Sequence, residues 1–113
     1  MELEEIKNKK NSIFVFESDE FGKHISGNAK TALSVFGAEY GFGYGLKGRS
    51  YALPTKDMFG DNLMSSEIEF YVDQLIKIAK TKKRKIFYIS EFENNLVNEM
   101  FKEKKLSKNI VLI

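Results

Sequence analysis

The chain has 113 residues, of which 42% are apolar and 30% are charged, and it contains one proline and no cysteine. Its 18 basic and 16 acidic residues nearly cancel to a formal charge of +2, which excludes a strongly basic nucleic-acid coat and an acidic disordered tail as descriptions of the whole protein. The absence of cysteine also excludes a disulfide framework and a thiolate metal site.

Chain length and the first residues set the expected domain organisation. A chain of this size is expected to form one domain around one core. We predict a polar leader over residues 1–12 and a single α/β domain over residues 13–113. The leader has no apolar segment typical of a signal peptide, and no run of 18 apolar residues occurs, so we expect a cytoplasmic protein with no membrane partner.

The first half of the domain has the pattern of a strand, a helix and a glycine-rich loop. Residues 13–16, Ile-Phe-Val-Phe, predict a short strand buried on both faces, as in a parallel sheet. Apolar residues then recur at helix spacing over residues 25–36, with Ser26 as the N-cap and Gly37 as the C′ glycine. Residues 38–50 alternate glycines with aromatic residues, which predicts a loop with some extended character.

The second half continues the alternation of strands and helices. A strand over residues 51–53 is expected to stop at Pro54, which has no N–H for a strand ladder. Ser66 and Glu69 have the spacing of a capping box at the start of a helix. The remaining predicted elements are helices over residues 66–80 and 94–104 and strands over residues 86–89 and 110–113. This order predicts an α/β fold with a small, mostly parallel sheet and right-handed crossover helices.

The segment after the first strand is the first candidate for a binding site. Ligands of open α/β sheets bind beyond the carboxyl ends of the strands, next to helix N-termini. Gly22 and Gly27 allow the backbone to approach a ligand, and the N–H groups near Gly27 and Asn28 favour an anion such as phosphate. Lys30 would add a positive charge, although the same segment also fits an ordinary connection that ends in a capped helix. A Walker P-loop is excluded because no Gly-Lys-Ser/Thr ending is present.

Two other features leave alternatives open. The glycines within residues 41–48 fit a ligand-binding loop and a flexible hairpin equally well. His24, the single histidine, fits either a ligand contact or a solvent-facing or capping role. No nucleophile–base pair is visible, and Glu17, Asp19 and Asp57 do not have the spacing of a metal site, so no catalytic residue, metal or cofactor is predicted.

The basic run over residues 80–85, Lys-Thr-Lys-Lys-Arg-Lys, is predicted to be a solvated turn between a helix and a strand. A surface that contacts a phosphate backbone is the alternative. The small net charge and the lack of interleaved aromatic residues favour the turn. Nucleic acid is therefore not an expected partner.

Residues 13–57 carry a series of short motifs: Gly-Lys-His at 22–24, Gly-Asn-Ala at 27–29, Phe-Gly-Ala at 36–38, and Ser-Tyr-Ala-Leu-Pro-Thr-Lys-Asp at 50–57. This segment resembles a family of small, mostly uncharacterised proteins of phages and prophages, most specifically over residues 48–57. That family looks like a compact relative of macro domains, which bind ADP-ribose and related nucleotides over a glycine-rich loop. The resemblance implies a macro-domain-like fold and a phage-type accessory protein that binds such a ligand. The binding residues that it implies are Ser18, Asp19, Gly22, His24, Gly27, Lys30, Gly43, Gly45, Gly48, Ser50, Thr55, Lys56 and Asp57.

The chain departs from the family pattern at the expected anion loops. Glu17 and Ile25 stand where the family usually has glycine, and Asp19 stands where it has asparagine. Residues 90–95 contain two acids and no glycine where the family has a second glycine-rich turn. Two further hypotheses follow: a degenerate scaffold that acts by contact with a host or phage protein, and a hydrolase of ADP-ribosyl or phosphate-ester bonds. If the chain binds a nucleotide, Gly43→Val is expected to abolish binding and leave the helices folded.

Overall fold

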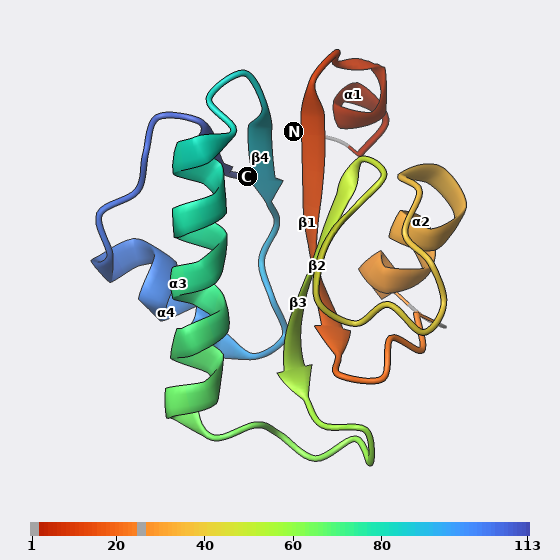
Figure 1. Ribbon diagram of the computed structural model, residues 1–113, viewed down its shortest axis with the longest axis vertical. Helices are drawn as coiled ribbons and strands as arrows, with labels where there is room; N and C mark the ends of the chain where they lie inside the picture. The colour runs from red at the N-terminus through yellow and green to blue at the C-terminus, as the bar shows by residue number, and fades with distance from the viewer. Residues whose placement is uncertain (1–2, 25–26) are drawn as a thin grey trace.

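The computed structural model describes residues 3–24 and 27–113, which form a mixed five-stranded sheet with helices on both faces (Figure 1). The elements are α1 (Leu3–Asn8), β1 (Ser12–Asp19), α2 (Gly27–Val35), β2 (Gly45–Lys47), β3 (Ser50–Lys56), α3 (Ser65–Thr81), β4 (Ile86–Ile89), α4 (Asn95–Glu103) and β5 (Ile110–Leu112). The strand order is β2-β3-β1-β4-β5, and only the pairing of β2 with β3 is antiparallel among these strands. The predicted α/β fold with a mostly parallel sheet and crossover helices is confirmed.

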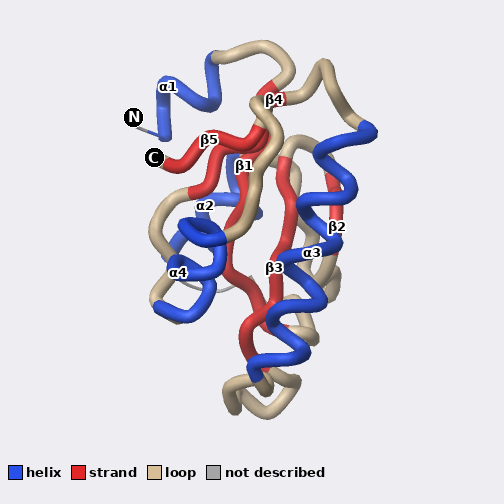
Figure 2. Tube along the Cα trace, turned by 90° about the vertical axis from the view of Figure 1, so that its left-hand side faces the viewer, coloured by secondary structure: helices blue, strands red, loops and turns tan. Residues whose placement is uncertain are grey.

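The central strand β1 separates two apolar clusters, and it is buried on both faces as predicted. Ile13 and Val15 pack in a cluster with α3 and α4, whereas Phe14 and Phe16 pack in a cluster with α1 and α2. Seen from the side, α3 lies on the opposite face of the sheet from α2 (Figure 2). Helices therefore cover both apolar faces of the sheet.

Strand β3 is longer than predicted, because Pro54 lies within it and does not end it. Pro54 pairs with Ser18 of β1, and the pairing continues to Lys56 after a register shift. On the other flank, the short strand β2 pairs only as far as Ala52. A proline is tolerated beyond that point because no ladder there needs its missing N–H. The predicted loop with some extended character is confirmed by β2, which spans only Gly45–Lys47.

A short helix, α1, occupies half of the predicted polar leader. Ile6 is fully buried in the apolar cluster that α1 shares with α2, and Leu3 packs against the same cluster. The Ser12 hydroxyl donates to the carbonyl oxygens of Ile6 and Lys9, at 2.7 and 2.9 Å, and the Arg49 guanidinium donates to the same two oxygens. These contacts hold the end of α1 against the start of β1.

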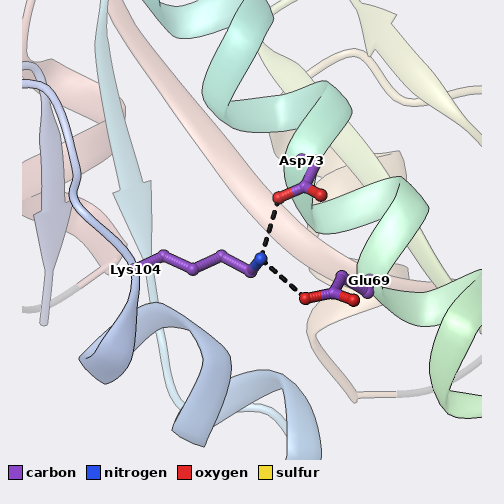
Figure 3. A network of polar contacts seen from close by, with 3 residues as sticks. All are labelled: Glu69, Asp73 and Lys104. Atoms are coloured by element: carbon purple, nitrogen blue, oxygen red, sulfur yellow. Dashed lines mark hydrogen bonds and ion pairs between the residues drawn. The ribbon is translucent and has the colours of Figure 1, made fainter.

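Helix α3 begins one residue earlier than predicted, and its capping differs from the predicted box. The carboxylate of Glu67, not that of Glu69, accepts a hydrogen bond from the backbone N–H at the helix start, which is that of Met64. Glu69 instead lies one turn along and, with Asp73, accepts from the Lys104 ammonium at the end of α4, at 2.8 and 3.0 Å (Figure 3). Lys104 therefore ties α4 to α3.

The other predicted helices match α2 and α4 to within two residues where the chain is described. Ile25 and Ser26, with which the first was expected to start, lie outside the described residues. Gly37 has φ +81°, as expected for a glycine just after a helix. Asn94 caps α4 by accepting from the N–H of Leu96. No helix in the described part of the chain is long and apolar enough to cross a bilayer.

The basic run begins in the last two residues of α3 and continues as a turn to β4, at the amino ends of the parallel strands. The side-chain amide of Asn109 donates to the carbonyl oxygens of Ala79, Lys82 and Lys85, at 2.8–3.1 Å, and so fixes the turn to the residues before β5. Lys9 and Lys10 precede β1 nearby, since the Asn11 carbonyl accepts from the N–H of Ile86. Basic charge therefore gathers at this end of the sheet.

Candidate functional site

A cavity of about 410 Å³ lies at the opposite end of the sheet, where β1 and β3 reach their carboxyl ends. Its walls come from these strand ends, the start of α2 and the loop between β4 and α4. The lining residues are Glu17, Ser18, Asp19, Lys23, His24, Gly27, Asn28, Ala29, Thr55, Lys56, Glu91, Phe92 and Glu93. Both its position and its size are typical of ligand sites in α/β proteins.

The carboxylate of Glu17 is held by three hydrogen bonds from two other elements. It accepts from the Thr55 hydroxyl at 2.7 Å and from the backbone N–H groups of Glu93 and Asn94, at 2.7 and 3.3 Å. The latter two groups lie immediately before α4, where the positive end of the helix favours an anion. A carboxylate of the chain itself therefore takes the donors that an external anion would use.

Asp19 is also engaged within the chain. Its Oδ1 accepts from the backbone N–H of Gly22 at 2.7 Å and from that of Lys23 at 3.4 Å, which closes the turn after β1. Lys23 and Lys56 line the cavity, and neither forms an ion pair with any other residue that the structure describes. These two ammonium groups are therefore the available positive side chains of the lining.

His24 is one of the lining residues, and its side chain is largely buried. The residue is 3% exposed, has φ +42°, and packs edge-on against Phe16. Its Nε2 lies 2.9 Å from the carbonyl oxygen of Phe42. Because a carbonyl only accepts, Nε2 carries a hydrogen. Within residues 3–24 and 27–113, Nδ1 has no hydrogen-bond partner.

The glycine-rich segment supports the cavity from behind and does not line it. The backbone of residues 41–43 crosses that of residues 19–22, and the Gly41 N–H donates to the Gly22 carbonyl at 2.8 Å. The Ser18 hydroxyl donates to the Gly43 carbonyl in the same crossing. The cavity therefore faces the β4–α4 loop, and residues 41–48 are not among its lining residues.

The structure brings together part of the predicted binding set. Ser18, Asp19, His24, Gly27, Thr55 and Lys56 line the cavity. The other predicted residues lie outside its lining: Gly22 and Gly43 in the backbone crossing, Lys30 exposed on α2, Gly45, Gly48 and Ser50 in the β2–β3 hairpin, and Asp57 in the loop after β3. Asp57 accepts from the N–H groups of Phe59 and Asp61, so it does not join Glu17 and Asp19 in one cluster.

Several lining residues were not in the predicted set. They are Glu17, Lys23, Asn28, Ala29, Glu91, Phe92 and Glu93. The position of residues 91–93 after a predicted strand was the available signal, because the carboxyl ends of parallel strands share one edge. Asn28 joins this loop directly, since its side-chain amide donates to the Ser90 hydroxyl at 2.9 Å.

Beside the cavity, Glu20 reaches a cluster of tyrosines. It accepts a 2.8 Å hydrogen bond from the Tyr71 hydroxyl. Burial raises the pKa of Tyr71 to about 12, and the hydrogen bond to Glu20 adds to the effect. Tyr44 packs between Tyr71 and Tyr51, with ring centroids 4.8 and 6.4 Å away. Both tyrosines with raised pKa values, Tyr51 and Tyr71, are therefore neutral over the physiological range.

The geometry defines a small α/β protein with a ligand-sized cavity at the carboxyl edge of a mostly parallel sheet. No protein-family model matches the chain, and neither a curated protein nor a solved structure does.

Proposed function

We propose that this protein binds a nucleotide or ADP-ribose-like ligand in the cavity at the carboxyl ends of β1 and β3. The observation that carries the proposal is the cavity itself, which is bordered by the start of α2 and lined by Lys23 and Lys56. Lys23, Lys56 and the N–H groups at the start of α2 would face a phosphate.

The nucleotide class itself rests on the resemblance of residues 13–57 to the macro-domain-like phage family. A second candidate, a degenerate scaffold that acts by contact with another protein, is favoured by one observation: Glu17 already satisfies donors that a phosphate would need. The hydrolase alternative, with Asp19 or His24 in the chemistry, gains no such support, because the described partners of both side chains are backbone groups and not a nucleophile.

Titration calorimetry and thermal unfolding with AMP, ADP-ribose and adenosine test the proposal. A ligand at 100 times its dissociation constant adds about 2.7 kcal/mol to the free energy of unfolding. Lys56→Gln is expected to weaken nucleotide binding, whereas Lys30→Gln, an exposed lysine outside the cavity, is the matched control and leaves it unchanged. If no nucleotide produces heat or a shift in the unfolding midpoint, the hypothesis of a scaffold that acts by protein contact replaces the nucleotide-binding proposal.

A further inference from the structure

We infer that two copies of this chain associate through the exposed edge of β5, paired antiparallel, so that their two sheets join into one. β5 forms one edge of the sheet and lies next to β4 (Figure 2). The inferred interface goes beyond the nucleotide cavity and does not depend on whether that cavity binds a ligand.

The first step of the argument is the direction of the backbone groups of β5. The Phe87 N–H of β4 donates to the Asn109 carbonyl oxygen at 2.7 Å, and the Ile113 N–H donates to the Ile89 carbonyl oxygen at 2.9 Å. Because the backbone groups of successive strand residues point to opposite sides, the N–H and the C=O of Leu112 point away from β4. No other strand of the described chain pairs on that side. The sequence of β5, Ile-Val-Leu, also has no charged residue or proline that would protect the edge.

The second step is an apolar cavity of about 280 Å³ along this edge, between β5 and α4. Ile89, Phe101, Leu112 and Ile113 supply its apolar lining. Leu112 is 46% exposed. In an antiparallel pair centred on this residue, the N–H of each Leu112 donates to the C=O of the other, and the two side chains lie opposite each other and shield one another from water.

The third step is a pair of opposite charges in the lining of the same cavity. Glu91 lies in the loop before α4, whereas Lys102 lies in the last turn of α4. Neither side chain forms an ion pair with another residue that the structure describes. An antiparallel second copy reverses the order of these charges, so that Lys102 of each protomer faces the Glu91 end of its partner. This charge complementarity identifies a second copy of the chain, in this orientation, as the occupant of the edge.

The length of β5 sets the expected strength of the association. The strand has three residues, about half of a typical strand. An interface built on so short an edge belongs to the small class, which buries less than about 1,200 Å². We therefore expect a weak dimer with a dissociation constant on the order of 100 μM.

Sedimentation equilibrium of the full chain between about 10 μM and 1 mM tests the inference, and the apparent mass is expected to rise from the monomer toward the dimer. Leu112→Lys places like charges opposite each other at the centre of the interface and should weaken association by about tenfold or more. Leu33→Lys, which changes an exposed leucine of α2, is the matched control and should leave association unchanged. Leu112→Pro removes the outward N–H without breaking a hydrogen bond to β4, and it should weaken association to a similar extent.

A charge exchange tests the orientation separately. Glu91→Lys and Lys102→Glu each set like charges against one another and should weaken association by about threefold, whereas the double variant should recover to within about twofold of the unmodified protein. A chain that stays monomeric at 1 mM would overturn the inference and leave the edge to another partner. Association that survives both substitutions of Leu112 would also overturn it, because another surface would then carry the contact. No recovery in the double variant would overturn the antiparallel arrangement.

Discussion

At the scale of single residues, the crossing of residues 19–22 with residues 41–43 depends on glycine. A Cβ on Gly43 would lie 2.3 Å from the Asp19 carbonyl oxygen, and one on Gly22 would lie 2.5 Å from the Phe42 nitrogen. Both contacts are with backbone atoms, which cannot rotate away. The expectation that Gly43→Val blocks binding and leaves the fold intact is therefore corrected. The added side chain would collide with the backbone of residues 19–20 and disrupt the packing of the chain.

Gly43→Ala is expected to lower the free energy of unfolding by about 2–3 kcal/mol, because the added methyl group overpacks a closed crossing. Gly60→Ala is the comparison, since Gly60 has φ +85° with open space around its Cβ position. Its cost is conformational only and should be about 1 kcal/mol. Urea unfolding followed by circular dichroism measures both, and equal effects would contradict the steric account.

The raised pKa of Tyr71 predicts a loss of stability at high pH. An unfolded tyrosine ionises near its ordinary pKa of 10.0, whereas folded Tyr71 ionises near 12 because of burial and the hydrogen bond to Glu20. The unfolded state therefore releases its proton first, and stability should fall as pH rises from about 10 toward 12. Glu20→Gln should lower the spectrophotometric pKa of this tyrosine without returning it to 10, because burial remains; an unchanged titration would contradict the assigned hydrogen bond.

At the scale of elements, a single ammonium group links the ends of α3 and α4. Lys104 lies between Glu69 and Asp73, and the hydrogen bonds to Glu69 first and Asp73 second raise its pKa (Figure 3). A raised lysine pKa contributes stability that is complete below the ordinary lysine pKa and is lost as pH rises through the folded value. Because the carboxylates of Glu69 and Asp73 are 53% and 54% exposed, solvent screens much of this contribution.

Lys104→Gln is expected to lower the free energy of unfolding by at most about 1 kcal/mol at neutral pH. The difference from the unmodified protein should shrink in 0.5 M NaCl and vanish at a pH where the ammonium is deprotonated. Urea titrations at two salt concentrations check this. A cost that is independent of salt would show that packing of the side chain, and not its charge, links the two helices.

In the turn after α3, two sets of substitutions distinguish the contribution of charge to stability from that of hydrogen bonding. Asn109→Ala removes the donors to three carbonyl oxygens of this turn and should lower the free energy of unfolding by about 1–3 kcal/mol. Joint substitution of Lys82, Lys83 and Arg84 by Gln should change it by no more than about 0.5 kcal/mol, because these side chains are exposed. Nucleic-acid retention should be the same before and after the triple substitution, and a salt-dependent affinity lost with it would contradict the solvated-turn interpretation.

The elements with strong apolar periodicity could be predicted from the sequence, and those formed through distant contacts could not. Residues 13–16 and 66–80 carry enough apolar side chains to define their own structure. By contrast, α1 depends on one buried isoleucine, and Pro54 is tolerated in β3 because β2 ends early. Such features come from tertiary contacts that local patterns do not encode.

At the scale of the whole molecule, the parallel arrangement explains why the site was only partly predictable. The strand ends near Ser18 and Thr55 were identified because ligands of such sheets bind there. The opposite wall was indicated only by the resemblance, because residues 91–93 meet these strand ends through the pairing of β1 with β4. The role of Glu17 was equally hidden: from sequence it was an acid that would repel a phosphate, whereas its partners are far along the chain.

The separation of charge along the sheet has a consequence for the speed of ligand encounter. Basic side chains gather at the amino ends of the strands, whereas the cavity at the carboxyl ends is lined by four carboxylates and two lysines. A diffusing anion is therefore attracted toward the amino ends of the strands, away from the cavity, and its approach to the cavity mouth is slowed. Stopped-flow association of AMP should accelerate as NaCl rises from 10 to about 200 mM, where the Debye length shrinks, while that of uncharged adenosine stays constant. An AMP rate that falls with salt would mean that Lys23 and Lys56 dominate the field that an approaching ligand meets.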